Sequence, residues 1–471
     1  MNTLNGIKVM LVNPRFTVHK NDVRRCVIPL GVAYLASFLE QYGCIVKILD
    51  VSAEGYYNTR IQDNFVTYGL SDIDIIKSIN KFSPDVVGVS CIFSAQSKNV
   101  KDILKLVKNV NKDIITITGG SHPTYAVEEM MNCKYLDYIV MGEGELPTLQ
   151  LLNTLNNGEN VSKIGGIAHK ENNKICINNN LQYIENLDTI PFPAWDLLNM
   201  ENYFKINMPH NPYSISKRVV PIVTSRGCPA KCTFCTSTNF WGRRYRERSP
   251  QNVISEIKEL IDKYRVEEIQ FTDDNFTLNK KRSLSILEGL ERLGLVWCAP
   301  NGIAVWTLDD ELLEEMKKTG CHQLTFAIES GNQYVLSKII KKPLNLKKVK
   351  PLVKKAHELG IKVHAFCICG MPGETIRQMH ETYDFVKDCE FDSSSFFAAT
   401  PLVGSELMKI CKENRYIEKD FVENELLFKV GNISTDDFDA EEIYELVKNF
   451  NYTYNKNDCR KKKIEEDSKR S

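Results

Sequence analysis

Two successive series of short β-branched runs, each alternating with amphipathic segments, constrain the fold of this chain most. In the first series, strands are predicted at residues 7–12, 45–49, 86–91, 114–118 and 137–140, with helices at 29–42 and 73–82. Nearly continuous apolar runs of this kind are typical of parallel strands that are buried on both faces. The pattern predicts an α/β chain that begins with a doubly wound, Rossmann-like sheet with right-handed crossovers.

The second series predicts strands at residues 219–223, 268–272, 296–299, 323–328, 361–368 and 394–399. Six strand–helix units are fewer than the eight of a closed barrel, so we expect an open partial barrel. The 471 residues exceed what one hydrophobic core usually holds. We therefore divide the chain into a first domain at 1–155, a linker with a hairpin at 156–210, the partial barrel at 211–405, and a short helical C-terminal region at 406–471. In the C-terminal region, we expect a helix near 440–450 and a charged, disordered end.

Ligands of doubly wound sheets bind at the carboxyl ends of the strands, here the loops at 13–16, 90–94, 119–124 and 142–145. In the third loop, Gly119 and Gly120 permit a tight turn and a close approach to a ligand, and Ser121 is a candidate N-cap. No G-x-G-x-x-G follows a strand, so this is not a dinucleotide fingerprint. A flat or phosphate-bearing ligand and a ligand-free interaction domain both remain open.

The charge balance argues against a nucleic-acid or membrane partner. Lysine plus arginine and aspartate plus glutamate number 60 each, so no strong field attracts the chain to a polyanion. The basic run at residues 243–248 is interrupted by Glu247, and we expect it to be a solvated or inter-domain surface. No apolar run reaches membrane-spanning length and the N-terminus does not resemble a signal peptide. The 15 cysteines then favour a reducing cytoplasm.

Three cysteines, Cys228, Cys232 and Cys235, lie directly after the first strand of the second series, with the spacing C-x3-C-x2-C. Three thiolates packed this tightly can hold three corners of an iron–sulfur cluster and leave the fourth iron open. A structural zinc site would need a fourth ligand, which usually comes from a second cysteine pair, and no such pair follows. A disulfide framework is untypical of a chain this long. Most other cysteines lie in apolar runs, as buried hydrophobic residues do.

Polar residues follow three strands of the second series, where barrel enzymes place their functional groups. Asp273, Asp274 and Asn275 can accept hydrogen bonds from an ammonium or a hydroxyl, although an acidic helix start would look the same. Glu329 is a carboxylate that leaves a buried strand. Gly370 and Gly373 permit close backbone approach, in a turn that also suits a helix start with Glu374 near its N-terminus.

The run TSRGCPAKCTFC resembles the signature of the radical S-adenosylmethionine enzymes. The resemblance implies that the cysteine triplet ligates a 4Fe-4S cluster and that S-adenosylmethionine chelates its open iron. It also implies that Phe234 lies against adenine, that the Asp273–Asn275 position holds the methionine amino group, that Glu329 binds the ribose, and that the loop from Gly370 to Gly373 lies near adenine. The segment LDTIPFPAWDLL resembles the linker of the same subfamily.

The segments VNPR, IPLGVAYLASFLEQYG, GGSHPT and MGEGE resemble the N-terminal cobalamin-binding domain of many such enzymes. By this resemblance, Gly119, Gly120 and Ser121 belong to a cobalamin site. The D-x-H-x-x-G motif that supplies a histidine ligand to cobalt in other cobalamin proteins is absent. His122 is therefore interpreted as a loop histidine, cobalamin would be held without a histidine on cobalt, and loss of the cofactor during evolution stays open.

The resemblance implies a class B-type methyltransferase that forms a 5′-deoxyadenosyl radical and, with cobalamin, methylates an unactivated carbon of a small molecule or lipid. Relatives of this architecture, such as the anaerobic oxidative cyclases, use the same radical for cyclisation, rearrangement or carbon–carbon coupling. The expected protein partner is an electron donor such as flavodoxin or ferredoxin. Two alternative functions are less well supported by the sequence. A tRNA-modifying enzyme would carry further cluster cysteines or a basic domain, and neither is found. A module that only carries electrons would need a fourth cysteine ligand, and the local loop offers no obvious one. The sequence assigns neither the substrate, nor the oligomeric state, nor a catalytic side chain beyond the cofactor sites.

Overall fold

The computed structural model describes residues 4, 6–20, 22–211, 213–417 and 431–456. The chain forms two compact units, which meet in sequence between Pro209 and His210. The charged C-terminal end, for which disorder was predicted, lies outside the described residues. Within the described residues, no helix combines the length and the apolar character needed to cross a membrane.

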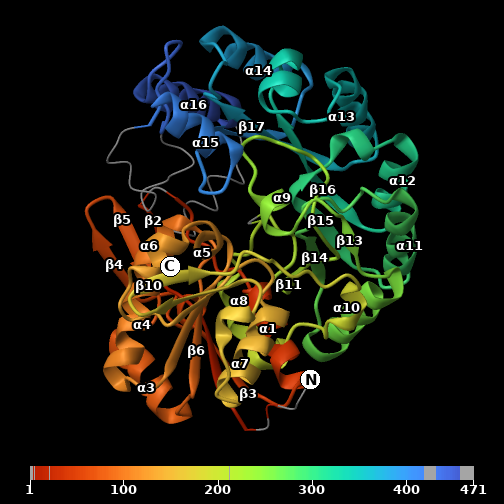
Figure 1. Ribbon diagram of the computed structural model, residues 1–471. Coiled ribbons are helices and arrows are strands. Elements are labelled where there is room, and N and C mark those ends of the chain that lie inside the picture. Colours follow the sequence, from red (N-terminus) through yellow and green to blue (C-terminus); the bar gives the residue numbers. More distant parts are fainter. Residues whose placement is uncertain (1–3, 5, 21, 212, 418–430, 457–471) are drawn as a thin grey trace. The chain divides into compact units, whose positions relative to one another are not determined.

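The first unit is built on a seven-stranded sheet, which confirms the predicted doubly wound fold (Figure 1). Its strand order is β10-β9-β8-β7-β6-β1-β3, and the strands from β8 to β3 are parallel. Their bounds are β1 Lys8–Asn13, β3 Ile45–Asp50, β6 Val86–Ser90, β7 Ile115–Gly119, β8 Tyr138–Val140, β9 Ile167–Glu171 and β10 Lys174–Ile177. The hairpin predicted within the linker is formed by β9 and β10, and it extends this sheet because β9 pairs antiparallel with β8.

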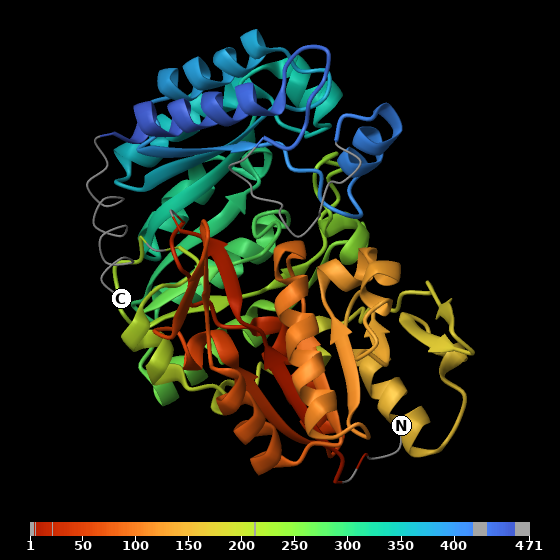
Figure 2. The ribbon, with the colours of Figure 1, turned by 90° about the vertical axis from the view of Figure 1, so that its left-hand side faces the viewer.

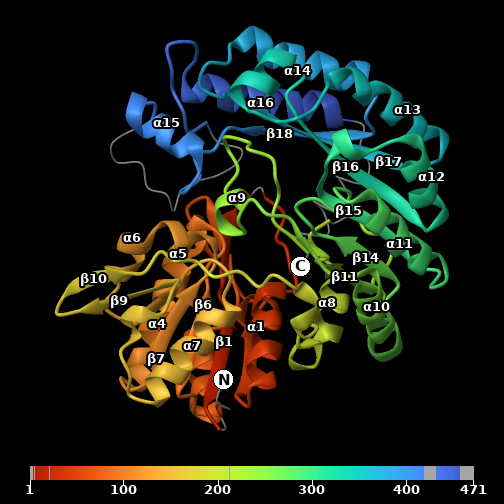
Figure 3. The same cartoon turned by 45° about the vertical axis from the view of Figure 1, so that its right-hand side comes forward.

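Helices cover this sheet in two groups. The group formed by α3 (Asp72–Phe82) and α4 (Ser97–Val110) packs Ile75, Ile79, Val100 and Ile103 into one buried cluster with strands β1 and β6. Helix α1 (Leu30–Gln41) contacts α7 (Glu145–Asn156) instead. Right-handed crossovers that run in opposite directions from β1 and β6 place the two groups on opposite faces (Figure 1), and Figure 3 shows α1 beside β1. The carboxyl ends of β1 and β6 therefore mark the topological switch point of the sheet.

The pattern of the sequence did not predict a small three-stranded antiparallel sheet of order β2-β5-β4. Its strands are β2 Phe16–His19, β4 Thr59–Gln62 and β5 Phe65–Tyr68. Gln96 in η1 (Ser94–Gln96) ties it to the switch point, because its side chain accepts from the Thr17 amide at 3.0 Å and donates to the Thr17 carbonyl at 3.1 Å. The remaining helices of this unit are α2 Val51–Glu54, α5 Ser121–Tyr125, α6 Val127–Met131, η2 Val161–Lys163, η3 Leu187–Thr189, η4 Trp195–Leu197 and α8 Met200–Ile206.

The second unit contains a six-stranded parallel sheet of order β11-β14-β15-β16-β17-β18, as predicted for an open partial barrel. Helices α10 to α14 follow the strands along its outer side (Figure 1). The strands are β11 Val219–Ile222, β14 Glu268–Phe271, β15 Val296–Ile303, β16 Cys321–Glu329, β17 Lys362–Cys369 and β18 Ser393–Ala398, and the helices are α10 Pro250–Tyr264, α11 Lys280–Glu291, α12 Asp310–Lys318, α13 Val349–Glu358 and α14 Ile376–Asp388. Shorter elements are β12 Ser225–Arg226, α9 Ser237–Phe240, β13 Arg246–Glu247, η5 Val305–Thr307, η6 Val335–Ile339, η7 Leu346–Lys348 and α15 Glu406–Asn414.

The C-terminal helix α16 (Ala440–Asn455) covers the edge strand β18 (Figure 2). Asn451 accepts from the Phe396 amide at 3.0 Å and donates to the Phe396 carbonyl at 2.7 Å. Asn455 repeats the pattern at Ser394, at 3.1 and 2.9 Å. Unpaired strand edges invite pairing with other chains, so two asparagine side chains here take the place of a seventh strand.

Candidate functional site

The three cysteines of the triplet lie on one loop after β12, and each is half-buried. Thr233, in the middle of the loop, is buried and fixes its position. Its amide donates to the Ile340 carbonyl at 3.0 Å, its hydroxyl donates to the Ile339 carbonyl at 3.1 Å, and its carbonyl accepts from the Leu407 amide at 2.8 Å. Phe234 beside it is half-buried. The loop is therefore held by segments more than 100 residues further along the chain.

Burial governs the acidity of the three thiols of the triplet. Burial raises the pKa of Cys232 to about 11 and that of Cys235 to about 12, so the thiols hold their protons until a cation binds. Three half-buried thiols on one loop fit a cluster with three protein ligands.

Asp273 organises the segment that precedes the triplet. Its buried carboxylate accepts from the Thr224 amide at 3.0 Å, the Thr224 hydroxyl at 2.7 Å and the Ser225 hydroxyl at 2.5 Å. Burial raises the pKa of Asp273 despite these donors. Its contacts thus bind the end of β14 to the end of β11, so the structure places Asp273 beside the cysteine loop as a support for it.

Asp274 and Asn275 differ from Asp273 in being available to a ligand. Asp274 is exposed and accepts from the Ser237 hydroxyl at 2.5 Å. Asn275 is completely buried, and among the described residues neither its amide nitrogen nor its amide oxygen has a nitrogen or oxygen hydrogen-bond partner. A buried, unsatisfied amide costs free energy, and its side chain lies close enough to Cys228 to lower the pKa of that thiol against the larger effect of burial. An orphaned amide beside the cysteine loop fits a site that a polar group completes.

Glu329 leaves β16 in a strained backbone conformation. The pairing of β16 with β17 shifts register between Ala327 and Glu329, and Glu329 has a φ of 66°. A register shift of this kind re-aims a side chain, and strain of this kind often marks functional positions. The Glu329 carboxylate is thereby brought to 2.7 Å from the Lys342 ammonium, and both side chains are buried.

Sequence reasoning missed Lys342. It follows the π-helical turn η6 and Lys341, whose φ of 63° is left-handed, and the Thr233 hydrogen bonds to residues 339 and 340 bring this segment to the cysteine loop. Burial acts to lower the pKa of Lys342, yet Glu329, Cys232 and Cys235 outweigh it, so the pKa lies above its usual value. Lys342 also lies 5.5 Å from the centre of the Trp306 ring. A lysine inside a basic run, KKPLNLKK, carries no local signal that would distinguish it.

The loop after β17 is closed by Glu374. Its buried carboxyl accepts from the amides of Gly370 at 3.0 Å and Met371 at 3.1 Å. Both Gly370 and Gly373 have left-handed backbones, with φ of 85° and 86°, which explains the glycines. Glu374 precedes the capping box of α14, formed by Thr375 and Gln378, so its role is to close the loop rather than to stabilise the exposed start of a helix.

Glu374 leads to a prediction about pH. Burial raises its pKa to about 8, against the opposing effect of the two amide donors, whereas an unfolded glutamate titrates near 4.3. The folded chain therefore holds a proton that the unfolded chain releases, and this stabilisation is complete below about pH 4 and is lost as the pH rises towards 8. We expect the difference in unfolding free energy between the wild type and Glu374→Gln to fall by up to about 1.4 kcal/mol per pH unit in this range. Urea unfolding of both anaerobic proteins from pH 5 to 9 measures it, and a difference independent of pH contradicts it.

In the first unit, the glycine pair of the third loop is explained by packing. Gly120 has a φ of 114°, and a Cβ added there would lie 2.6 Å from the Cys91 carbonyl oxygen. The close approach that glycine permits is thus to the chain itself. The expectation that Ser121 is an N-cap is wrong: the N-cap of α5 is Gly120, without a side-chain hydrogen bond, and Ser121 is the first helical residue. The hydrogen bonding of the loop decides this boundary, and residue preference alone does not.

His122 is a buried helix residue, not a free loop histidine. Its Nδ1 lies 3.0 Å from the Ser94 hydroxyl and its Nε2 lies 2.7 Å from a Glu129 carboxylate oxygen. Burial acts to raise the pKa of Glu129, but hydrogen bonds from His122 and Lys101 outweigh it and hold that pKa at about 2. With both ring nitrogens occupied, His122 is not placed to bind a metal ion.

The switch point of the first sheet presents apolar side chains to solvent. Ile92 and Phe93, in the loop after β6, are 51% and 48% exposed. Exposed large hydrophobic residues at the carboxyl end of a strand are unusual unless a ligand or partner covers them. Their position fits a ligand with a flat, apolar face, and a flat ligand is one of the possibilities that the sequence left open.

The basic run at residues 243–248 is only partly a solvated surface. Arg243 and Arg244 are exposed, but Arg246 and Arg248 are buried. Arg246 donates to the Trp241 carbonyl at 3.0 Å, and Arg248 pairs with buried Glu256 at 2.5 Å. The expectation of a solvated surface is wrong for these two residues, because Arg246, on β13, donates to a main-chain carbonyl and Arg248, just after it, pairs with a buried carboxylate.

Two known domains match the chain. Residues 17–152 match the B12 binding domain, and residues 222–386 match the Radical SAM superfamily. The first match lies in the unit with the doubly wound sheet, and the second contains the cysteine triplet, Asn275, Glu329, Lys342 and the loop closed by Glu374. Together they imply a 4Fe-4S cluster, S-adenosylmethionine and cobalamin as cofactors.

Whole proteins with both parts are also similar to this chain. The cytidylyl-2-hydroxyethylphosphonate methyltransferase of Streptomyces wedmorensis is 42% identical, over 95% of this chain and 90% of its own length. The anaerobic magnesium-protoporphyrin IX monomethyl ester cyclase of Rubrivivax gelatinosus is 28% identical, over 86% of this chain and 70% of its own. A structure of the radical S-adenosylmethionine methyltransferase TsrM of Kitasatospora setae shares the fold, with a TM-score of 0.69, 18% identity, and coverage of 87% of this chain and 77% of its own.

Proposed function

Because this chain belongs to the radical S-adenosylmethionine enzymes that carry a cobalamin-binding domain, we propose that it methylates an unactivated carbon of a small molecule. One observation carries the proposal: the 42% identity to a methyltransferase extends over 90% of that relative's length. Both cofactor domains and the segments that join them are therefore retained together.

The residues of the second unit fit the cluster and S-adenosylmethionine. We assign Cys228, Cys232 and Cys235 as cluster ligands, held in place by Thr233 and Asp273. Asn275 and Asp274 are available to the amino group of the methionine moiety, whereas Phe234 and the loop from Gly370 to Gly373 are assigned to adenine. When bound, these cofactors supply a 5′-deoxyadenosyl radical and cobalamin supplies a methyl group; the chain contributes positioning and exclusion of water.

Lys342 changes what the resemblance implied for Glu329. The carboxylate predicted to bind ribose hydroxyls already accepts a charged hydrogen bond at 2.7 Å. A carboxylate has room for further donors, so Glu329 can bind a hydroxyl while it also accepts from the Lys342 ammonium. Lys342 is then a positioning residue, which holds the glutamate and adds a positive charge beside the cysteine loop.

The first unit fits a cobalamin that lacks a histidine ligand. Exposed Ile92 and Phe93 offer apolar contact at the switch point, and the nearby His122 has both ring nitrogens engaged. We assign the loop with Gly119, Gly120 and Ser121 to the same site, with the glycines acting through the shape of the turn.

A prediction follows for His122. In the wild type, the electron paramagnetic resonance spectrum of bound cobalamin in its cobalt(II) state is expected to lack the splitting that an axial histidine nitrogen causes. His122→Gln should leave that spectrum unchanged and lower the unfolding free energy by about 1–3 kcal/mol, because it disturbs two buried hydrogen bonds. Nitrogen splitting in the wild type that disappears in the variant would show that His122 binds cobalt.

The substrate class is proposed from the same relative. A small molecule with a phosphonate linked to a nucleotide is the first compound to test, since the relative is a cytidylyl-2-hydroxyethylphosphonate methyltransferase. The enzyme, purified anaerobically with cluster and cobalamin, is supplied with S-adenosylmethionine that carries an isotopically labelled methyl group. We expect labelled methylated product together with 5′-deoxyadenosine and S-adenosylhomocysteine.

The second candidate is the same radical chemistry without methyl transfer, which the likeness to the anaerobic cyclase favours. It predicts 5′-deoxyadenosine and a modified substrate that contains no label. That outcome would contradict the methyltransferase proposal. The reaction needs an electron donor, and we propose flavodoxin or ferredoxin; replacing dithionite with either protein in the same assay tests this part separately.

A further inference from the structure

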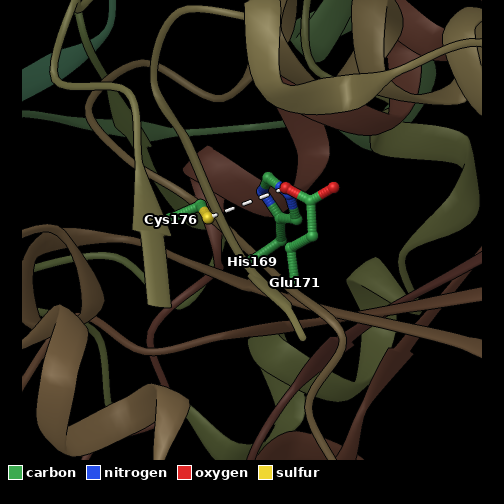
Figure 4. A group of neighbouring side chains, drawn as sticks. All are labelled: His169, Glu171 and Cys176. Carbon is green, nitrogen blue, oxygen red and sulfur yellow. Dashed lines mark hydrogen bonds between the residues drawn. The ribbon is translucent and has the colours of Figure 1, made fainter. Parts of the chain in front are cut away.

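A second group of metal-binding side chains lies in the first unit, on the hairpin of β9 and β10. Candidate ligand atoms of His169, Glu171 and Cys176 all lie within 4.8 Å of one another (Figure 4). His169 and Glu171 are two residues apart on β9 and so share a face of the sheet. Cys176 lies directly opposite His169 in the register of the hairpin. The hairpin thus brings nitrogen, oxygen and sulfur donors together within ten residues of sequence.

His169 is the most telling member of this group. It is only 7% exposed, and in the described part of the chain no hydrogen bond to its ring nitrogens is found. Buried polar groups normally have partners. Its ring packs against Tyr138, its neighbour on β8, with ring centres 6.2 Å apart. The imidazole is therefore oriented by packing, and its ring nitrogens, which make no hydrogen bond in the described part of the chain and are not fully buried, stay accessible to a cation.

The other two donors suit the same purpose. Cys176 is half-buried and lies 4.0 Å from a Glu171 carboxylate oxygen, to which its thiol is directed. Glu171 is exposed, so its side chain is free to move. Zinc bound by sulfur, nitrogen and oxygen holds these atoms roughly 3.4–3.6 Å apart. Rotation of the Glu171 side chain and closure by about 1 Å bring the three donors to that spacing.

Another set of candidate metal ligands, Glu268, Cys298 and His322, is a weaker candidate for a metal site than the hairpin group. Glu268 accepts from the Ile215 and Ser216 amides, both at 2.8 Å, and pairs with His322 at 3.0 Å. Cys298 accepts from the Asn211 amide group at 3.5 Å. These donors are occupied in attaching Asn211, Ile215 and Ser216 to the barrel strands, whereas the ring of His169 has no such partner among the described residues.

We propose that the β9–β10 hairpin binds one zinc ion through His169, Glu171 and Cys176, with water in the fourth position. Binding replaces the thiol proton of Cys176, which is released to solvent. Cysteine, histidine and carboxylate together suit zinc among the abundant divalent ions. The ion would join the edge strand β10 to β9 beside β8, and so fix the end of the sheet.

Equilibrium dialysis against zinc, on enzyme already loaded with cluster and cobalamin, tests the proposal. Metal analysis should find one zinc per wild-type chain, and X-ray absorption at the zinc edge should show one sulfur with nitrogen and oxygen neighbours. Cys176→Ser and His169→Gln should weaken binding at least tenfold, since even outer-shell changes cost about 10–100-fold. Lys174→Gln, which removes an ammonium opposite Glu171 in the register, should strengthen it.

Cys133→Ser is the matched control, because Cys133 is a half-buried cysteine of the same unit outside the group. It should bind zinc as the wild type does, and cluster and cobalt content should be equal in all variants. Zinc binding that is absent in the wild type, or equal in Cys176→Ser and the wild type, overturns the proposal. So does a zinc spectrum with three sulfur neighbours, because it would place the ion on the triplet in the second unit.

Discussion

Cys232→Ala is expected to abolish cleavage of S-adenosylmethionine, with a loss of at least about 10³-fold, or about 4 kcal/mol of transition-state stabilisation. The physical reason is that the variant loop supplies only two of the three cysteine sulfurs that hold the cluster. The neighbouring Thr233 keeps its three main-chain and hydroxyl contacts in the variant, so the loop itself should remain folded. The measurement is 5′-deoxyadenosine formation under dithionite, together with iron per chain and the visible absorption of the cluster.

The control for this prediction is Cys133→Ala, which removes a half-buried thiol far from the triplet in sequence. It should retain iron content and activity. Cobalt content should be equal in both variants and the wild type, because the B12 domain match ends at residue 152. Full iron content and cleavage by Cys232→Ala would contradict the assignment of this cysteine as a ligand.

Lys342→Met is expected to lower the unfolding free energy of the second unit by about 3–5 kcal/mol, since it leaves the buried carboxylate of Glu329 without its partner. It should also make the cluster harder to reduce, because it removes a positive charge that acts on the cysteine thiols. Urea unfolding measures the first effect, and a redox titration followed by electron paramagnetic resonance measures the second. A change in stability without a change in potential would reduce Lys342 to a structural residue.

Lys341→Met is a closely matched control for this variant. Lys341 precedes Lys342 in sequence, but its side chain is 45% exposed and pairs with exposed Glu406. Surface ion pairs contribute about 0–1 kcal/mol, so both readouts should stay near those of the wild type. The double variant Lys342→Met with Glu329→Gln should recover much of the stability, since no buried charge is left unpaired, yet it should keep the altered potential.

The sequence predicted the sheets well because their strands are buried on both faces. Runs such as residues 86–91 and 361–368 are mostly apolar, and this pattern is local. The three-stranded sheet of β2, β4 and β5 was not predicted because its strands are short and partly exposed. The role of α16 was not predicted either, because Asn451 and Asn455 act on a strand more than 50 residues away.

At the candidate site, the sequence identified residue types but not their partners. The sequence does not distinguish the adjacent polar residues Asp273, Asp274 and Asn275. In the structure, Asp273 accepts hydrogen bonds from the segment that precedes the cysteine loop, whereas the amide of Asn275 has no nitrogen or oxygen partner among the described residues. His122 lacked the expected motif, and the structure adds that both of its ring nitrogens are engaged. Such differences depend on contacts between distant segments, which no local pattern records.

By itself the sequence determined the chemistry that begins the reaction and the two sheets that carry it, because ligand spacing and hydrophobic period are local properties of a chain. Only the tertiary structure decided how the cysteine loop is supported and which charge acts on it. Thr233 reaches residues 339 and 340, Asp273 reaches Thr224, and Lys342 reaches Glu329. Each of these contacts joins residues that are far apart in the sequence and meet only in the folded chain. The free energy that such a contact contributes is therefore not visible in the residues next to either partner.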